Sequence, residues 1–331
     1  MGVFCEINLF KSRDGVFVAG STVKGAIRYA VDEETTFGEI VVSLKGKGVL
    51  CLKRKHNDKS KEVTYRRSEQ YLDLNNVVVE SGKNIVITKG SYEIPFTFRL
   101  PRNIPPTFRH SSSNIQYAVN CNIRYYLSIK FQRPGFWKLD KKYKKEITID
   151  SGIQPRLPLE SIIYGKQKKL SRLFTRKNSA ITIKAGIAKS VIAPGDKVEF
   201  EYEVVNDSNV IVKAVETKLL EVLTFKTKSK TVTECRDVPQ TECKTGSVKS
   251  DDSQTMSVEI DVPLDNKSLD FSELVARDYY VQITVELPFP HFDSKLQIPI
   301  QVGDTAVSNL LEPPPSYWEA MGEEEKDDKD N

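Results

Sequence analysis

The feature that most constrains this chain is an alternation of apolar and polar residues with a period of two. In residues 197–204, the apolar side chains fall on one face of an extended chain and the charged side chains fall on the other. The same pattern recurs in residues 40–44, 256–262 and 281–287, and helical periodicity is nearly absent. Short alternating segments separated by Gly, Pro, Asn and Asp predict an all-β chain of antiparallel strands rather than an α/β fold.

A weak internal repeat indicates how these strands are organised. Three segments of the first half have counterparts in the second half at similar offsets, and the first pair shares a hydrophobic strand end, a glycine turn and an alternating strand. The paired segments are 18–27 with 192–201, 94–101 with 256–263, and 117–119 with 280–282. Two immunoglobulin-type β-sandwiches of one topology, arranged in tandem, account for this repeat.

The predicted organisation has four parts. We expect an N-terminal sandwich over residues 1–155, a basic interdomain linker over residues 156–178, a C-terminal sandwich over residues 179–303, and a disordered, flexible acidic tail over residues 304–331. The linker is placed where prolines, a glycine and a run of lysines interrupt the alternation.

Charge is distributed unevenly between these parts. The net charge is +4, and residues 304–331 contain nine acidic residues and two lysines, which sum to −7, so residues 1–303 carry +11. A basic body favours partners with acidic surfaces, such as the inner leaflet of a membrane or phosphorylated peptides.

No segment has the sequence pattern of a membrane span or of a signal peptide. No apolar run approaches the roughly 18 residues of a membrane span, and charge appears as early as Glu6, so we expect a cytosolic protein. The five cysteines are odd in number and dispersed, which favours reduced thiols. Cys235 and Cys243 are the one close pair, and we interpret them as two limbs of a loop rather than as a metal or redox site.

Residue patterns typical of catalysis are also missing. The three histidines, His56, His110 and His291, are isolated, and no Cys-x-x-Cys or His-x-x-x-His arrangement occurs. We therefore expect no catalytic residues, no metal and no cofactor. Nucleic-acid binding is not expected either, because the aromatic residues fall mostly at inward-facing strand positions.

The sharpest motif lies in the tail. Pro314, Pro315, Ser316 and Tyr317 fit the PPxY pattern. Successive prolines favour a polyproline II helix, which places two proline rings and the tyrosine along one side. A WW domain offers an aromatic groove for such prolines, and a ligand that is already extended loses less entropy on binding. We predict that Pro314, Pro315 and Tyr317 bind a WW domain.

Several short basic segments are candidates for contact with phosphates or acidic phospholipid headgroups. They include residues 53–55, 66–67 and 141–145, and the strongest is 166–177, which mixes cations with apolar residues. The candidates in this last segment are Lys166, Lys168, Lys169 and Arg172. A solvated polar loop is the alternative interpretation of each segment.

Taken together, these segments resemble the arrestin-domain-containing family, the α-arrestins, over almost the whole chain. The residues that carry the resemblance are 18–25, 92–101, 116–121, 193–196 with 203–208, 296–303, and the tail segment 313–321. The resemblance implies two arrestin-like β-sandwiches that act as a non-catalytic adaptor. Relatives often have two PPxY motifs, whereas this chain has one.

In that family, the body associates with cytosolic regions of membrane receptors or transporters, and the PPxY motif recruits HECT-type E3 ubiquitin ligases through their WW domains. The resemblance implies ubiquitination, endocytosis and endosomal sorting of the cargo, in a cytoplasmic protein recruited to the plasma membrane and endosomes. A phosphate-sensing role would fall on Lys11 and Arg13, for which a solvated strand face is the alternative. The second hypothesis is a retromer-like coat subunit of arrestin fold that needs no ligase, and the third is an enzyme.

Overall fold

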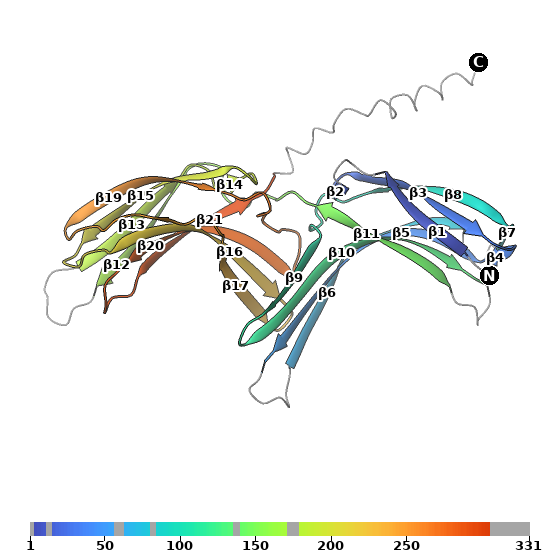
Figure 1. The fold of residues 1–331 in the computed structure, drawn as a ribbon, viewed down its shortest axis with the longest axis horizontal. Helices are drawn as coiled ribbons and strands as arrows, with labels where there is room; N and C mark the ends of the chain where they lie inside the picture. Colours follow the sequence, from blue (N-terminus) through green and yellow to red (C-terminus); the bar gives the residue numbers. More distant parts are fainter. Residues whose placement is uncertain are drawn as a thin grey trace, which may run out of the picture.

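The computed structural model describes residues 3–10, 15–55, 63–79, 84–134, 140–170 and 179–304. Within these ranges the regular secondary structure consists of strands, β1 to β21, with no helix. The strands form two sandwiches that lie side by side, with the N-terminal one on the right of Figure 1 and the C-terminal one on the left. The predicted all-β fold with two tandem sandwiches is confirmed.

The N-terminal sandwich is built from a three-stranded sheet and a six-stranded sheet. The three-stranded sheet has the order β1 (Val3–Phe10), β3 (Thr22–Val31) and β8 (Gly90–Arg99). The six-stranded sheet has the order β2 (Val16–Val18), β11 (Lys141–Asp150), β10 (Tyr117–Gln132), β5 (Glu39–Arg54) and β6 (Val63–Val79), and β9 (Phe108–Ser113) also pairs with β10. A separate pair joins β4 (Thr35–Phe37) to β7 (Ile85–Ile87).

The C-terminal sandwich has a similar plan, with four strands instead of three in its smaller sheet. Its four-stranded sheet has the order β12 (Ile162–Leu170), β13 (Ser179–Ile187), β15 (Lys197–Asp207) and β19 (Asp252–Asp261). Its six-stranded sheet has the order β14 (Val191–Ile192), β21 (Ser294–Val302), β20 (Val275–Glu286), β16 (Ala214–Lys226) and β17 (Thr231–Asp237), and β18 (Cys243–Lys244) also pairs with β16.

The alternation read in the sequence is what assembles these sheets. In β15, Val198, Phe200, Tyr202 and Val204 are each at most 4% exposed, whereas the residues between them are charged or half-buried. Because successive side chains of a strand point to opposite faces, one face of each sheet packs on its partner and the other faces solvent.

The internal repeat corresponds to matched turns in the two sandwiches. Gly20 follows β2 with φ of 89°, and Gly195 follows β14 with φ of 88°, a region that glycine adopts without steric cost. The N–H of Gly20 donates to the carbonyl of Pro101 at 3.1 Å, and the N–H of Gly195 donates to the carbonyl of Val262 at 3.0 Å. The same turn therefore leads into the same strand position in both halves.

The expected linker over residues 156–178 is wrong at its centre. Residues Ile162–Leu170 form strand β12, which pairs antiparallel with β13 at the edge of the C-terminal sandwich. The alternation is hidden in the sequence because two of the inward positions hold lysines instead of apolar residues. At the open edge of a sandwich, a long lysine stem can be half-buried while its ammonium group finds a polar partner.

Candidate functional site

The junction between the two sandwiches is a continuous hydrophobic core. Leu223 and Phe225 of β16 and Leu274, just before β20, are at most 1% exposed and belong to the same core cluster as the N-terminal sandwich. Figure 1 shows the inner ends of β9 and β10 beside β16 and β17 at the centre of the molecule. A Cβ added at Gly48 of β5 would lie 2.7 Å from Leu274 Cδ1, so the Leu274 side chain packs directly against the backbone of β5 here.

A partly buried polar cluster lies beside this core. The ring of His110 on β9 stacks on Phe225 with centroids 5.0 Å apart, and its Nε2 lies 3.0 Å from Glu234 Oε2 on β17. Ser112 donates to the other oxygen of Glu234, and an Arg236 Nη2 donor lies 3.1 Å from Oε2. Burial lowers the pKa of His110, and these hydrogen bonds hold the pKa of Glu234 below its usual range.

Two further polar contacts fix the junction at its ends. Arg67 of β6 donates to the main-chain oxygen of Glu273 at 3.2 Å and also pairs with the Glu273 carboxylate. Arg156, which follows the N-terminal sandwich, reaches Asp270 at 2.7 Å and Asp278 at 3.3 Å. Burial raises the pKa of Asp278, and the guanidinium of Arg156 opposes that shift. These contacts connect the two sandwiches without forming a reactive centre.

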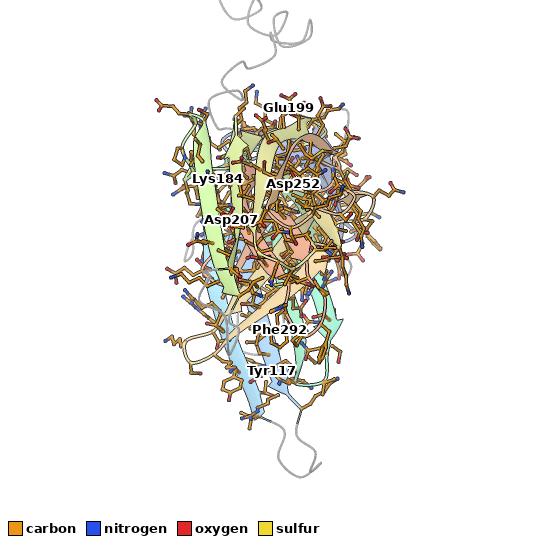
Figure 2. All side chains as sticks on the ribbon, turned by 90° about the vertical axis from the view of Figure 1, so that its left-hand side faces the viewer. Tyr117, Lys184, Glu199, Asp207, Asp252 and Phe292 are labelled. Atoms are coloured by element: carbon orange, nitrogen blue, oxygen red, sulfur yellow. The ribbon has the colours of Figure 1, made fainter. Side chains whose placement is uncertain are left out.

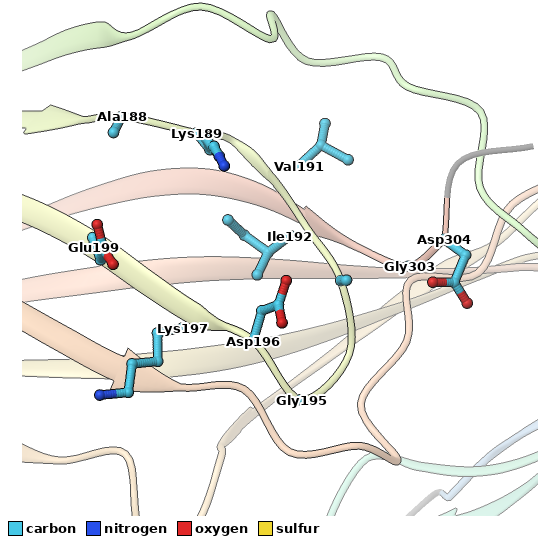
Figure 3. Close-up of a pocket in the computed structure, with 11 residues that line it drawn as sticks. Ala188, Lys189, Val191, Ile192, Gly195, Asp196, Lys197, Glu199, Gly303 and Asp304 are labelled. Carbon is cyan, nitrogen blue, oxygen red and sulfur yellow. The ribbon is translucent and has the colours of Figure 1, made fainter. Parts of the chain in front are cut away.

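The described chain ends at this junction. The N–H of Gly303 donates to the carbonyl of Ile192 at 2.9 Å, and the carbonyl of Asp304 accepts from the N–H of Ile153 at 2.9 Å. Both residues line a surface pocket of about 630 Å³ together with Lys189, Ile192 and Asp196, and Figure 3 shows its mixed charges. The tail therefore begins between the sandwiches.

Most of the residues predicted to carry function lie outside the described residues. These are Lys11, Arg13, Arg172, Pro314, Pro315 and Tyr317, and the predicted flexible tail lies outside them as well, apart from Asp304.

The remaining three predicted site residues lie on β12. Lys166 Nζ donates to the carbonyl of Lys295 at 2.6 Å, and Lys168 Nζ donates to the carbonyls of Phe292 and Asp293. Lys169 is exposed at an outward position of the same strand. Lys166 and Lys168 therefore hold β12 against β21 and the loop that precedes it, whereas Lys169 faces solvent.

Sequence reasoning did not find the junction residues. His110, Glu234 and Arg156 belong to three distant segments, and none of those segments has a motif that marks it. The one sequence signal available was the isolation of His110, a residue type that is often buried when it has a polar partner.

The outer face of the four-stranded sheet in the C-terminal sandwich is acidic. Figure 2 shows Glu199, Asp207 and Asp252 on the side of this sandwich that faces the viewer. Glu199 on β15 lies directly opposite Glu259 on β19, an arrangement of like charges that is destabilising by itself. The positive charge of the body is therefore concentrated elsewhere.

The part of the chain that the structure describes contains neither a cluster of metal ligands nor a membrane-spanning helix. No group of three or more His, Cys, Asp or Glu side chains lies close enough together there to hold a metal ion. No helix among those residues has the length and hydrophobicity needed to cross a bilayer. All five cysteines are free.

Comparison with known proteins is consistent with this architecture. The family model described as Arrestin (or S-antigen), N-terminal domain, matches residues 5–154, and the model for the C-terminal domain matches residues 177–307. The chain is 20% identical to Arrestin domain-containing protein 5 of Homo sapiens over 325 residues, which cover 94% of this chain and 91% of that protein.

Two further relatives match over shorter lengths. Arrestin domain-containing protein 17 of Caenorhabditis elegans is 23% identical over 234 residues, which cover 67% of this chain. The match spans 52% of that protein, so the chain corresponds to about half of its length. The bovine protein 5 is 23% identical over 221 residues, which cover 65% of this chain and 63% of that protein. On the two domain matches and the shared architecture, the chain belongs to the arrestin domain-containing proteins, the α-arrestins, whose members are in general non-enzymatic adaptors.

Proposed function

We propose that this protein links cytosolic regions of membrane receptors or transporters to HECT-type E3 ubiquitin ligases. Its two sandwiches would bind the cargo, and Pro314, Pro315 and Tyr317 would bind a WW domain of the ligase. The expected result is ubiquitination of the cargo, followed by endocytosis and endosomal sorting. The protein would act in the cytoplasm and be recruited to the plasma membrane and endosomes.

The observation that carries the proposal is the combination of an arrestin body with a PPxY motif shortly after its last strand. Pro314 stands ten positions after Asp304 in the sequence. Over that length, a fully extended chain reaches at most about 35 Å. A ligase bound to the motif would therefore remain near the domain junction and near any cargo held by the body.

The physical advantage of such a link is a high effective concentration. When ligase and cargo are held on one adaptor, their encounter becomes intramolecular, and the rate of transfer rises without a new bond made by the adaptor. The buried junction supports this role because Phe225, His110 and Glu234 fix one sandwich against the other. A rigid body limits the volume that the ligase and the cargo explore.

The proposal is tested by titrating a peptide of residues 308–323 and the full-length protein into isolated WW domains of HECT-type ligases. Micromolar binding is expected for both, and the Tyr317→Ala variant of each should lose it. Tyr317 follows the last strand, β21, in the sequence, so we expect the thermal unfolding of the full-length variant to match the wild type. Equal binding, or no binding, by wild type and variant would contradict the proposal and favour the coat-subunit hypothesis.

A further inference from the structure

The connection between β20 and β21 presents two aromatic rings to solvent. Phe289 is 96% exposed and Phe292 is 85% exposed. A phenylalanine ring is usually buried, because water solvates its surface poorly. Two such rings side by side in one short segment are typical of a surface that binds a partner. We call residues 287–293 the aromatic loop.

Hydrogen bonds hold the aromatic loop in one shape. The N–H of Leu287 donates to Asp293 Oδ1 at 3.0 Å. The N–H of His291 donates to the carbonyl of Pro288 at 3.0 Å. Lys168 Nζ, which comes from β12, donates to the carbonyl of Asp293 at 3.2 Å. A loop that is already ordered loses little conformational entropy when a partner covers its rings.

A shallow groove lies on the three-stranded sheet of the N-terminal sandwich, and its volume is about 660 Å³. One row of side chains across this sheet begins with Phe4 on β1 and continues with Ala30 on β3 and Ser91 on β8. The ring of Phe4 is 69% exposed, and the two side chains beside it are short. Tyr92 and Tyr143 also line the groove. The groove is therefore a hollow beside aromatic surface, which can accept another ring.

The groove and the aromatic loop have charges of opposite sign next to them. In the groove, Glu6 lies opposite Arg28, and Arg28 pairs with Glu93 at 2.8 Å, so carboxylates outnumber cations there. Beside the aromatic loop, β12 contains three lysines and no acidic residue. The aromatic loop has one acidic residue, Asp293, so β12 and the loop together carry +2 with His291 neutral. Such opposite charges favour the approach of one surface to the other.

The aromatic loop and the groove lie at opposite ends of the molecule. In Figure 1, the connection between β20 and β21 is at the left end, and β1 begins at the right end, where the N-terminus is marked. Figure 2 looks onto the left end of that view and labels Phe292 there. One copy cannot bring its own loop to its own groove, so a contact between these surfaces joins two copies.

We propose that the aromatic loop of one copy binds the groove of a second copy. Phe289 and Phe292 would pack against Phe4 and over Ala30, and the lysines of β12 would face the carboxylates of the groove. The two surfaces of this contact are different, so a bound pair still has one free loop and one free groove. Further copies can therefore add head to tail.

The contact is small, so it is weak. Two phenylalanine side chains bury about 150–250 Å² each, whereas a stable interface buries about 800 Å² on each partner. Association is therefore expected at high local concentration, as when several copies bind one cargo. A pair of copies has two PPxY motifs, whereas each copy has one, and two motifs raise the affinity for a ligase with several WW domains. That consequence rests on the proposed function, but the contact itself does not.

The test is sedimentation velocity of the full-length protein at increasing concentration. The wild type should associate. Phe289→Ala/Phe292→Ala should weaken the association about a hundredfold or more, since burial of each ring contributes a factor of about ten or more. The matched control Ile115→Ala/Leu264→Ala truncates two exposed apolar side chains outside both surfaces and should change the association less than about threefold.

A mixture of two variants shows whether the contact is head to tail. Ser91→Arg fills the hollow beside Phe4 and adds a positive charge to the groove, so this variant and the double phenylalanine variant should each be monomeric. When the two are mixed, each pair has one intact loop and one intact groove. The mixture should therefore form dimers and nothing larger, whereas the wild type also forms longer assemblies.

Three results would overturn the proposal. The first is a wild type that stays monomeric at every concentration, including the case in which its aromatic loop binds lipid vesicles instead. The second is dimer formation by Ser91→Arg alone, which would mean that two loops meet. The third is a mixture that stays monomeric. Thermal unfolding shows that each variant is folded, and unchanged binding of an isolated WW domain by both variants keeps the outcome separate from the proposed ligase link.

Discussion

Removal of the Phe225 ring should weaken the junction between the sandwiches more than any exposed aromatic substitution. Phe225 is 0% exposed, lies in the core cluster of the N-terminal sandwich although it belongs to β16, and stacks on His110. Truncation of a buried Phe to Ala typically costs about 3–5 kcal/mol, from lost transfer energy and the cavity left behind. That is a large fraction of the roughly 5–15 kcal/mol that stabilises a domain.

The assay is urea denaturation of the full-length protein followed by circular dichroism, together with small-angle scattering in native buffer. Phe225→Ala should lower the free energy of unfolding by about 3 kcal/mol or more and increase the radius of gyration. Phe289→Ala, which truncates a ring that is 96% exposed, is the matched control and should stay within about 0.5 kcal/mol of wild type. If both variants lose the same free energy, the ring is not packed between the sandwiches and the account of the junction is incorrect.

Three other predictions concern packing, protonation and thiol reactivity. Gly25→Ala should destabilise the protein by about 1–3 kcal/mol, because the new Cβ would lie 2.2 Å from a main-chain oxygen of the neighbouring strand, whereas Gly186→Ala, with nothing within 4 Å, should be neutral or stabilising in the same denaturation assay. Because burial lowers the pKa of His110, the unfolded chain binds a proton more readily, so stability should decrease as pH falls below about 6.5, and His110→Gln should flatten that part of the stability curve. A thiol reagent should modify the exposed Cys235 rapidly in the native protein and spare Cys121, since burial raises the pKa of that thiol to about 12.

The parts of the fold that follow local rules were predictable. Alternation with a period of two depends on the geometry of a single strand, so it identified the buried faces of β15 and β20 from sequence. The turns at Gly20 and Gly195 were also visible, because a backbone with positive φ selects glycine wherever it occurs. Together with two other matched pairs of segments, these turns indicated two sandwiches of one topology.

Features that depend on pairing between distant strands were not predictable. The sequence predicts a linker where β12 lies, because Lys166 and Lys168 occupy inward positions that apolar residues usually hold. The carbonyl groups that accept their hydrogen bonds are about 125–130 residues away in the chain. The polar cluster at the junction has the same origin, since His110 and Glu234 meet although 124 residues separate them in the chain. Nothing in one sequence fixes such a contact.

The most direct measurement of the adaptor role is affinity capture from cells with the full-length protein and its Tyr317→Ala variant, quantified by mass spectrometry. We expect the wild type to recover HECT-type ligases together with membrane receptors or transporters. The variant should lose the ligases and keep the membrane proteins. Recovery of the ligases by both baits, or by neither, would contradict the account.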